Sequence, residues 1–123
     1  MSKANIVLCV TGSIAAFKAA ALASRLTKSK CDVQVIQTTG SKHFICEATF
    51  EGLTGKPVLS DVFHKGAAMQ HIDLVRWADV FVVYPCSANM IAKLSSGTSD
   101  DLTSCVFVAN NFEKPFWIAP AMN

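Results

Sequence analysis

Four short segments of small and polar residues each follow an apolar run in the sequence. They are Thr11–Ser13, Thr38–Ser41, Pro85–Asn89 and Pro120–Asn123. Glycine lets a backbone approach a ligand closely, while hydroxyl and amide side chains offer hydrogen-bond donors and acceptors. Loops of this composition are typical of sites that hold a phosphate group or a planar polar ligand.

The first of these segments has the features of an anion site. Gly12 permits close approach, and Ser13 adds a hydroxyl group at the start of a predicted helix whose first charged residue is Lys18. Because no acidic residue lies in the first turn, the helix dipole can stabilise a phosphate group. The alternative interpretation is a tight turn with Ser13 as a helix cap. The segment matches neither the P-loop pattern nor GxGxxG, which favours a mononucleotide over a dinucleotide.

His71 is the candidate for proton transfer, because histidine titrates near neutral pH. A histidine in the first turn of a helix also commonly has a structural or solvated role, and His43 and His64 lie in no motif. Asn89 and Asn123, at the ends of strands, are compatible with turn capping or with hydrogen bonds to a planar ligand or a carboxylate. The residues alone leave these alternatives open.

The elements that must position these loops alternate along the chain. Strands are predicted over 6–10, 33–37, 80–84 and 116–119, with a further extended piece over 57–63. Helices are predicted over 14–28, 42–53, 69–78 and 89–94. A last helix follows, with Leu102, Val106 and Phe107 in its body. Pro85 is expected to end the third strand, and Thr98 with Asp101 resembles a capping box. This alternation predicts a single α/β domain over residues 1–123, with a three-layer, flavodoxin-like or Rossmann-like fold and a mainly parallel sheet. The carboxyl ends of parallel strands meet at one edge, so the four loops are expected to form one site.

Composition excludes several classes of protein. The 123 residues suit one domain, and a content of 51% hydrophobic and 16% charged residues argues against intrinsic disorder. No apolar run reaches the roughly 18 residues of a membrane-spanning helix, and the apolar run over 6–10 is too short for a secretory signal. The 11 Lys and Arg residues are dispersed and the net charge is only +2, which argues against a nucleic-acid partner.

The cysteines indicate a reducing compartment. The five cysteines are odd in number and widely spaced, without the pairs that metal sites and redox motifs require. Cys9 and Cys105 lie in apolar runs and are expected to be core residues, whereas Cys86 is expected in a loop of the site. These observations predict a cytoplasmic protein with free thiols and without a bound metal.

The motifs together resemble those of the flavin-containing cysteine decarboxylases, a family of FMN-dependent, homo-oligomeric proteins. The matching segments, in order along nearly the whole chain, are Val10–Ala16, His71–Leu74, Arg76–Asp79, Pro85–Asn89, Ile91–Lys93, Gly97, Asp100–Leu102 and Ala119–Asn123. Each segment is weakly specific by itself, but the ordered set is highly specific.

The resemblance implies FMN as the cofactor and assigns roles to residues of this chain. It implies that FMN is bound by Gly12, Ser13, Ile14, Ser41, Phe44, Ser87, Ala88, Asn89, Met90 and Ala121. It also implies that His71 is catalytic and that Asn123 holds the substrate carboxylate. Met90 departs from the family's usual Ser-Ala-Asn-Thr segment and removes a hydroxyl group near the flavin. The chain ends inside the family motif Pro-x-Met-Asn-x-x-Met-Trp, so a truncated flavoprotein domain, without the family's flap and its cysteine, is expected.

The reaction implied by the resemblance is the FMN-dependent decarboxylation of 4′-phospho-N-pantothenoylcysteine to 4′-phosphopantetheine in coenzyme A biosynthesis. The expected assembly is a homo-oligomer, a trimer or a multiple of trimers. Two alternatives share the fold: an oxidative decarboxylase of peptide C-terminal cysteines, as in lantibiotic maturation, and a non-catalytic FMN-binding regulator of a phosphatase. The presence of both His71 and Asn123 favours an enzyme.

Overall fold

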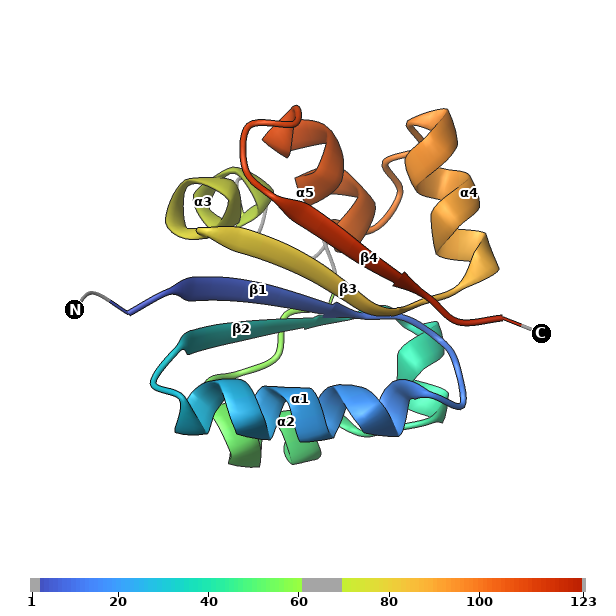
Figure 1. Cartoon of the computed structure of the whole chain (residues 1–123). Coiled ribbons are helices and arrows are strands. Elements are labelled where there is room, and N and C mark those ends of the chain that lie inside the picture. Colours follow the sequence, from blue (N-terminus) through green and yellow to red (C-terminus); the bar gives the residue numbers. More distant parts are fainter. Residues whose placement is uncertain (1–2, 61–69, 123) are drawn as a thin grey trace.

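The computed structural model describes residues 3–60 and 70–122, and within them four strands form one parallel sheet (Figure 1). The strands are β1 (Asn5–Val10), β2 (Asp32–Gln37), β3 (Val80–Cys86) and β4 (Phe116–Pro120). Their order in the sheet is β2-β1-β3-β4, with parallel pairing throughout. The predicted flavodoxin-like α/β fold is therefore confirmed.

Helices cover both faces of the sheet, which gives the three expected layers (Figure 1). One face carries α1 (Ala16–Lys28) and α2 (Glu47–Thr54). The other carries α3 (Gln70–Trp77), α4 (Ala88–Ser96) and α5 (Leu102–Asn110), and a short 3₁₀ helix, η1 (Gly40–His43), follows β2. In the described part of the chain, no helix has the length and apolar character that crossing a membrane requires.

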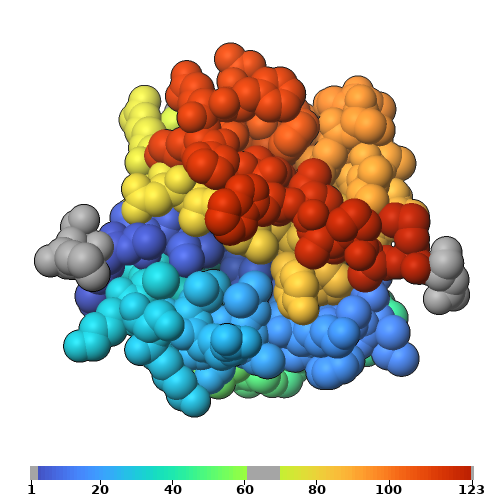
Figure 2. Space-filling view, in the orientation of Figure 1, coloured from blue at the N-terminus to red at the C-terminus, as the bar shows by residue number. Residues whose placement is uncertain are grey.

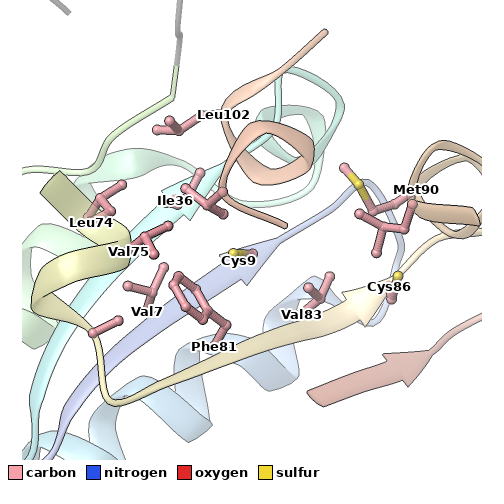
Figure 3. Close-up of a cluster of buried hydrophobic side chains, with 13 residues drawn as sticks. Val7, Cys9, Ile36, Leu74, Val75, Phe81, Val83, Cys86, Met90 and Leu102 are labelled. Carbon is pink, nitrogen blue, oxygen red and sulfur yellow. The ribbon is translucent and has the colours of Figure 1, made fainter. Parts of the chain in front are cut away.

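Each face of the sheet buries its own apolar cluster because successive strand residues point to opposite faces. Leu8 and Val10 of β1 pack beneath α1 and α2. Val7 and Cys9 pack on the other face with side chains from β3 and three helices, as Figure 3 shows. The central strand β1 is therefore apolar on both sides, which explains why its sequence does not alternate.

Strand β4 forms an edge of the sheet and is less buried than β1. Figure 2 shows its residues, in red, on the surface above the light-blue residues of α1. Trp117 is 65% exposed and Ile118 41% exposed. The sheet is thus covered on its faces but open along this edge.

The third strand continues through Pro85, so the expectation that Pro85 ends it is wrong. β3 runs to Cys86, whose partner in β4 is Pro120, with a shift in register between Val83 and Cys86. Proline cannot donate to the ladder, and an irregularity at this point accommodates it. Cys86 is consequently buried at the end of a strand, and the expected loop begins only at Ser87.

Two helix starts also differ from expectation. The helix predicted over 42–53 is divided into η1 and α2, with Cys46 in an extended conformation at the start of α2. The capping box predicted for Thr98 and Asp101 is shifted: Asp101 is itself the capping residue, and its carboxylate accepts a hydrogen bond from the backbone N–H of Ser104 at 2.8 Å. Serine replaces the glutamate or glutamine usual at that position, and this hid the box from the sequence pattern.

The cysteines are free thiols, as expected, but their burial differs from the expectation at one position. Cys9 is fully buried, whereas Cys105 is only partly buried. Burial raises the pKa of the Cys9 thiol from its ordinary value of 9.0 to about 12, and burial raises the pKa of Cys86 to about 11.

These raised pKa values predict alkaline destabilisation. Above the ordinary thiol pKa of 9.0 the unfolded chain releases protons that the folded chain retains, so the free energy of unfolding falls as the pH rises toward the folded-state values. The Cys9→Ala variant is expected to be less stable at neutral pH and to lose less stability between about pH 9 and 11 than the unchanged protein. Urea denaturation at several pH values measures this, with Val7→Ala as a truncation in the same cluster that removes no titrating group. An equal alkaline loss in Cys9→Ala and Val7→Ala would exclude Cys9 as its source.

Candidate functional site

The loops at the carboxyl edge of the sheet enclose a pocket of about 500 Å³. It is lined by Thr11, Gly12, Thr38, Thr39, Gly40, Ser60, Ser87, Asn89, Met90, Lys93, Asp100 and Asp101. Three of the four predicted loops contribute to this lining, as the parallel topology requires. The pocket also contains charged residues from the end of α4 and the start of α5, which the sequence analysis did not assign to the site.

The first two loops touch through their glycines. A Cβ atom on Gly12 would lie 3.1 Å from the carbonyl carbon of Gly40 and 3.3 Å from its oxygen. Such distances are too short for a relaxed contact with backbone atoms, so a side chain at Gly12 would separate the loops. The close contact between the two loops therefore favours glycine at position 12.

Thr11 joins the first loop to the third. Its hydroxyl group donates to the carbonyl oxygen of Pro85 at 2.6 Å and accepts from the backbone N–H of Ser87 at 2.9 Å. Thr11 is 1% exposed. These two hydrogen bonds join Thr11 to residues 74 and 76 positions away in the sequence, beside the pocket.

The start of α1 leaves its helix dipole available to a ligand. The helix begins at Ala16, two residues after the predicted start, and has no acidic residue in its first turn. Ser13 accepts hydrogen bonds from the N–H of Ala15 through its side chain, at 3.1 Å, and from the N–H of Ala16 through its carbonyl oxygen, at 2.9 Å. Ser13 is therefore not the helix cap, which is Ala15; it closes the turn before a helix N-terminus without an acidic residue.

The third loop presents amide and hydroxyl groups. Ser87 caps α4 by accepting a hydrogen bond from the N–H of Met90 at 3.2 Å. Asn89 is exposed and lines the pocket. Met90 is 2% exposed and packs in the cluster with Cys86, as Figure 3 shows. The methionine that replaces the family's usual threonine thus contributes to the core as well as to the pocket wall.

A lysine and two aspartates form an ion-paired group at one side of the pocket. The Nζ atom of Lys93 lies 2.8 Å from Oδ2 of Asp101 and 3.0 Å from Oδ1 of Asp100. The hydrogen bond to Asp101 is the main cause that raises the pKa of Lys93 above its ordinary value. Lys93 lies in the motif segment Ile91–Lys93, and the two aspartates lie in the segment Asp100–Leu102. The sequence alone did not indicate that these two segments are in contact.

Removing the Lys93 charge is expected to disfavour an anionic ligand. The Lys93→Met variant removes the cation that pairs with the two carboxylates at the pocket, and we expect it to lower affinity for FMN by about 1 kcal/mol, roughly fivefold. Titration at low and high salt measures this, because added salt should reduce the difference. Lys93→Arg keeps the charge and should retain the affinity. Equal loss of affinity for riboflavin, which has no phosphate group, would contradict the electrostatic explanation.

The structure does not bring every predicted residue to this pocket. Gly12, Ser87, Asn89 and Met90 line it, whereas Ser13, Ile14, Ser41, Phe44, Ala88 and Ala121 do not. Ser41 is fully buried, while Ile14 is 82% exposed and Phe44 53% exposed. The N–H of Ala121 donates to the carbonyl oxygen of Cys86 at 3.0 Å, which fixes the fourth loop beside the third.

His71 lies in the first turn of α3 and is not part of the pocket lining. Its side chain is half-buried, and its Nδ1 atom is buried without a hydrogen-bond partner in the described part of the chain. Asn123, the predicted ligand of the substrate carboxylate, lies outside the described residues, as does His64. No cluster of three potential metal ligands occurs among the residues that the structure describes.

Sequence comparisons connect the whole chain to known proteins. The profile of the flavoprotein family matches residues 1–123. The coenzyme A biosynthesis bifunctional protein CoaBC of Bacillus subtilis is 39% identical over 125 residues, which cover 100% of this chain and 30% of that protein. The probable phosphopantothenoylcysteine decarboxylase of Streptococcus mutans is 42% identical over 121 residues, which cover 97% of this chain and 68% of the relative. The chain therefore spans about 30% of the length of its bifunctional relative.

Solved structures show the same arrangement. The FMN-dependent cysteine decarboxylase SpaF superposes with a TM-score of 0.87 and 29% identity, over 98% of this chain and 69% of that one. A PPC decarboxylase variant complexed with pantothenoylaminoethenethiol superposes with a TM-score of 0.83 and 32% identity, over 99% of this chain and 69% of that one.

Proposed function

The chain belongs to the flavoprotein family, and from that membership we propose that it binds FMN and catalyses the decarboxylation of 4′-phospho-N-pantothenoylcysteine to 4′-phosphopantetheine. The names of its relatives support this reaction, since they include a coenzyme A biosynthesis protein and a phosphopantothenoylcysteine decarboxylase. The observation that carries the proposal is the pocket in which Gly12 and Gly40 meet at the carboxyl edge of the sheet.

The residues of the pocket fit a flavin mononucleotide. A volume of about 500 Å³ lies in the usual range for small-molecule sites. The backbone of Gly12 and Gly40 at the pocket, with the hydroxyl groups of Thr38 and Thr39, suits a phosphate group beside the N-terminus of α1. Asn89 supplies an amide for the polar edge of the ring system. When bound, FMN supplies the ability to accept a hydride from the substrate and to return it.

His71 is proposed to exchange the proton of the substrate's thiol group, and Asn123 to hold the substrate's carboxylate. The half-buried imidazole of His71 has an Nδ1 atom without a hydrogen-bond partner among the described residues, and histidine is the side chain best suited to proton transfer near neutral pH. Because His71 is not part of the pocket lining, a homo-oligomer is part of the proposal, as a trimer or a multiple of trimers. A second copy would add residues to the site.

Exposed apolar side chains near the carboxyl edge of the sheet support this assembly. Ile14, Phe17, Phe44 and Met122 are 82%, 63%, 53% and 57% exposed. Apolar side chains that lie together at a site commonly mark an interface. Light scattering of the FMN-loaded protein tests the assembly, and a flavin-loaded monomer would contradict it. A reducing, cytoplasmic location completes the proposal, since it suits the five free thiols.

Release of CO₂ from two substrates tests the proposed reaction. The FMN-loaded protein is incubated in parallel with 4′-phosphopantothenoylcysteine and with a peptide that ends in cysteine. Turnover of the first alone supports the proposal, and turnover of the peptide alone would assign the chain to the peptide decarboxylases. FMN binding without CO₂ release from either substrate would support a regulatory FMN-binding protein.

A further inference from the structure

Gln37, the last residue of β2, is a buried polar side chain directly behind the second loop. It is 0% exposed. Its Nε2 atom donates hydrogen bonds to the hydroxyl oxygen of Ser41 at 3.1 Å and to the carbonyl oxygen of Ile45 at 3.0 Å. One side chain therefore connects the end of the strand to both halves of the segment 38–45.

Ser41 extends this connection to the residues that line the pocket. It is also 0% exposed, and its hydroxyl group donates to the carbonyl oxygen of Thr38 at 2.7 Å. Its backbone N–H donates to the same carbonyl oxygen at 3.1 Å. These bonds close the turn that presents Thr38, Thr39 and Gly40 to the pocket, where Gly40 meets Gly12.

The amide group of Gln37 is only partly satisfied by hydrogen bonds. Burying an amide group carries a cost of about 1–3 kcal/mol unless hydrogen bonds compensate it. The Nε2 atom is satisfied, but the Oε1 atom of Gln37 is buried without a partner among the described residues. An apolar side chain of similar size would remove the unsatisfied oxygen, but it would also take the donor away from the Ser41 hydroxyl group and the Ile45 carbonyl group and would not direct the loop.

We infer that Gln37 is a positioning residue, which acts through Ser41 to hold the loop that binds the phosphate group of the ligand. The inference rests on the proposed binding of FMN. It predicts that Gln37 contributes to affinity for FMN and not to affinity for riboflavin, which has the same ring system and lacks the phosphate group.

The test compares both affinities in Gln37→Met. Titration followed by flavin fluorescence is expected to show at least a tenfold loss of affinity for FMN, with affinity for riboflavin within twofold of the unchanged protein. Asn110→Leu is the matched control. Asn110 is also a buried amide that holds a turn, through hydrogen bonds with the N–H and carbonyl groups of Lys114, but it lies at the opposite end of the sheet from the pocket. This control should lower the free energy of unfolding and leave the ratio of the two affinities unchanged.

Ser41→Ala is a second variant, and it removes the hydroxyl group that accepts a hydrogen bond from Gln37. It should likewise lower the ratio of the affinity for FMN to the affinity for riboflavin. If Gln37→Met does not fold, Gln37→Leu, which likewise cannot donate to Ser41, decides the question. Equal losses for FMN and riboflavin, or an FMN affinity within twofold of the unchanged protein, would overturn the inference while leaving the proposed function intact. Failure of the unchanged protein to bind FMN would overturn the proposed function, and the inference with it.

Discussion

Replacing His71 with asparagine is expected to slow decarboxylation of 4′-phosphopantothenoylcysteine by at least ~100-fold while FMN remains bound. Asparagine approximates the size of histidine but cannot exchange a proton near neutral pH. Because His71 lies outside the lining of the pocket, its loss should leave the flavin site unchanged. Initial rates of CO₂ release at saturating FMN, together with the dissociation constant for FMN, measure the two effects separately.

The matched control for this prediction is His43→Asn. His43 is exposed on η1 and carries no proposed role, so both the rate and the FMN affinity of this variant should stay close to those of the unchanged protein. A His71→Asn rate within threefold of the unchanged rate would remove His71 from the mechanism. A loss of both FMN affinity and the rate of CO₂ release in His71→Asn would instead show that His71 contributes to FMN binding.

Replacing Gly12 with valine is expected to weaken FMN binding by roughly 100-fold. The added Cβ atom would lie 3.1 Å from the carbonyl carbon of Gly40, and the two methyl groups of valine extend further. The neighbouring atoms belong to the backbone and not to a flexible side chain, so the two loops must move apart to admit the side chain. Overpacking of this kind costs about 1–3 kcal/mol, and its upper end corresponds to this loss of affinity. Fluorescence titration with FMN measures the change.

Gly52→Ala is the control, because a Cβ atom on this glycine would not meet the backbone of another loop. Gly52 lies inside α2, and a Cβ atom there would meet nothing within 4 Å. Alanine should stabilise the helix by about 0.5–1 kcal/mol and leave FMN affinity unchanged. An FMN affinity within threefold of the unchanged protein in Gly12→Val would show that the contact between Gly12 and Gly40 is dispensable for binding.

The fold was predictable because its determinants are local. Short runs of β-branched and apolar residues separated by helical spacing indicate buried parallel strands, and the order of such elements restricts the topology. The predictions for the end of β3 and for the capping box were wrong because a single residue in each place departs from the usual pattern. Pro85 was accommodated by an irregular register within β3, and Ser104 completed a capping box in place of an acidic residue.

The site was predictable only in part, for a different physical reason. Gly12, Ser87 and Asn89 follow strands directly, so topology alone brings them to the pocket. Gln37 contacts the loop that follows its own strand and Lys93 contacts the start of α5, and no local pattern distinguishes a buried glutamine that holds a turn from one that does not. His71 could be identified as a candidate from its chemistry, but its position relative to the pocket depends on the packing of α3.

Titration of the purified protein with FMN tests the assignment of the pocket most directly. We predict saturable binding of FMN with quenching of its fluorescence and a yellow protein after removal of free ligand, with affinity for FMN roughly 100-fold lower in Gly12→Val and unchanged in Gly52→Ala. A protein that stays colourless after incubation with excess FMN and leaves flavin fluorescence unchanged would contradict the assignment.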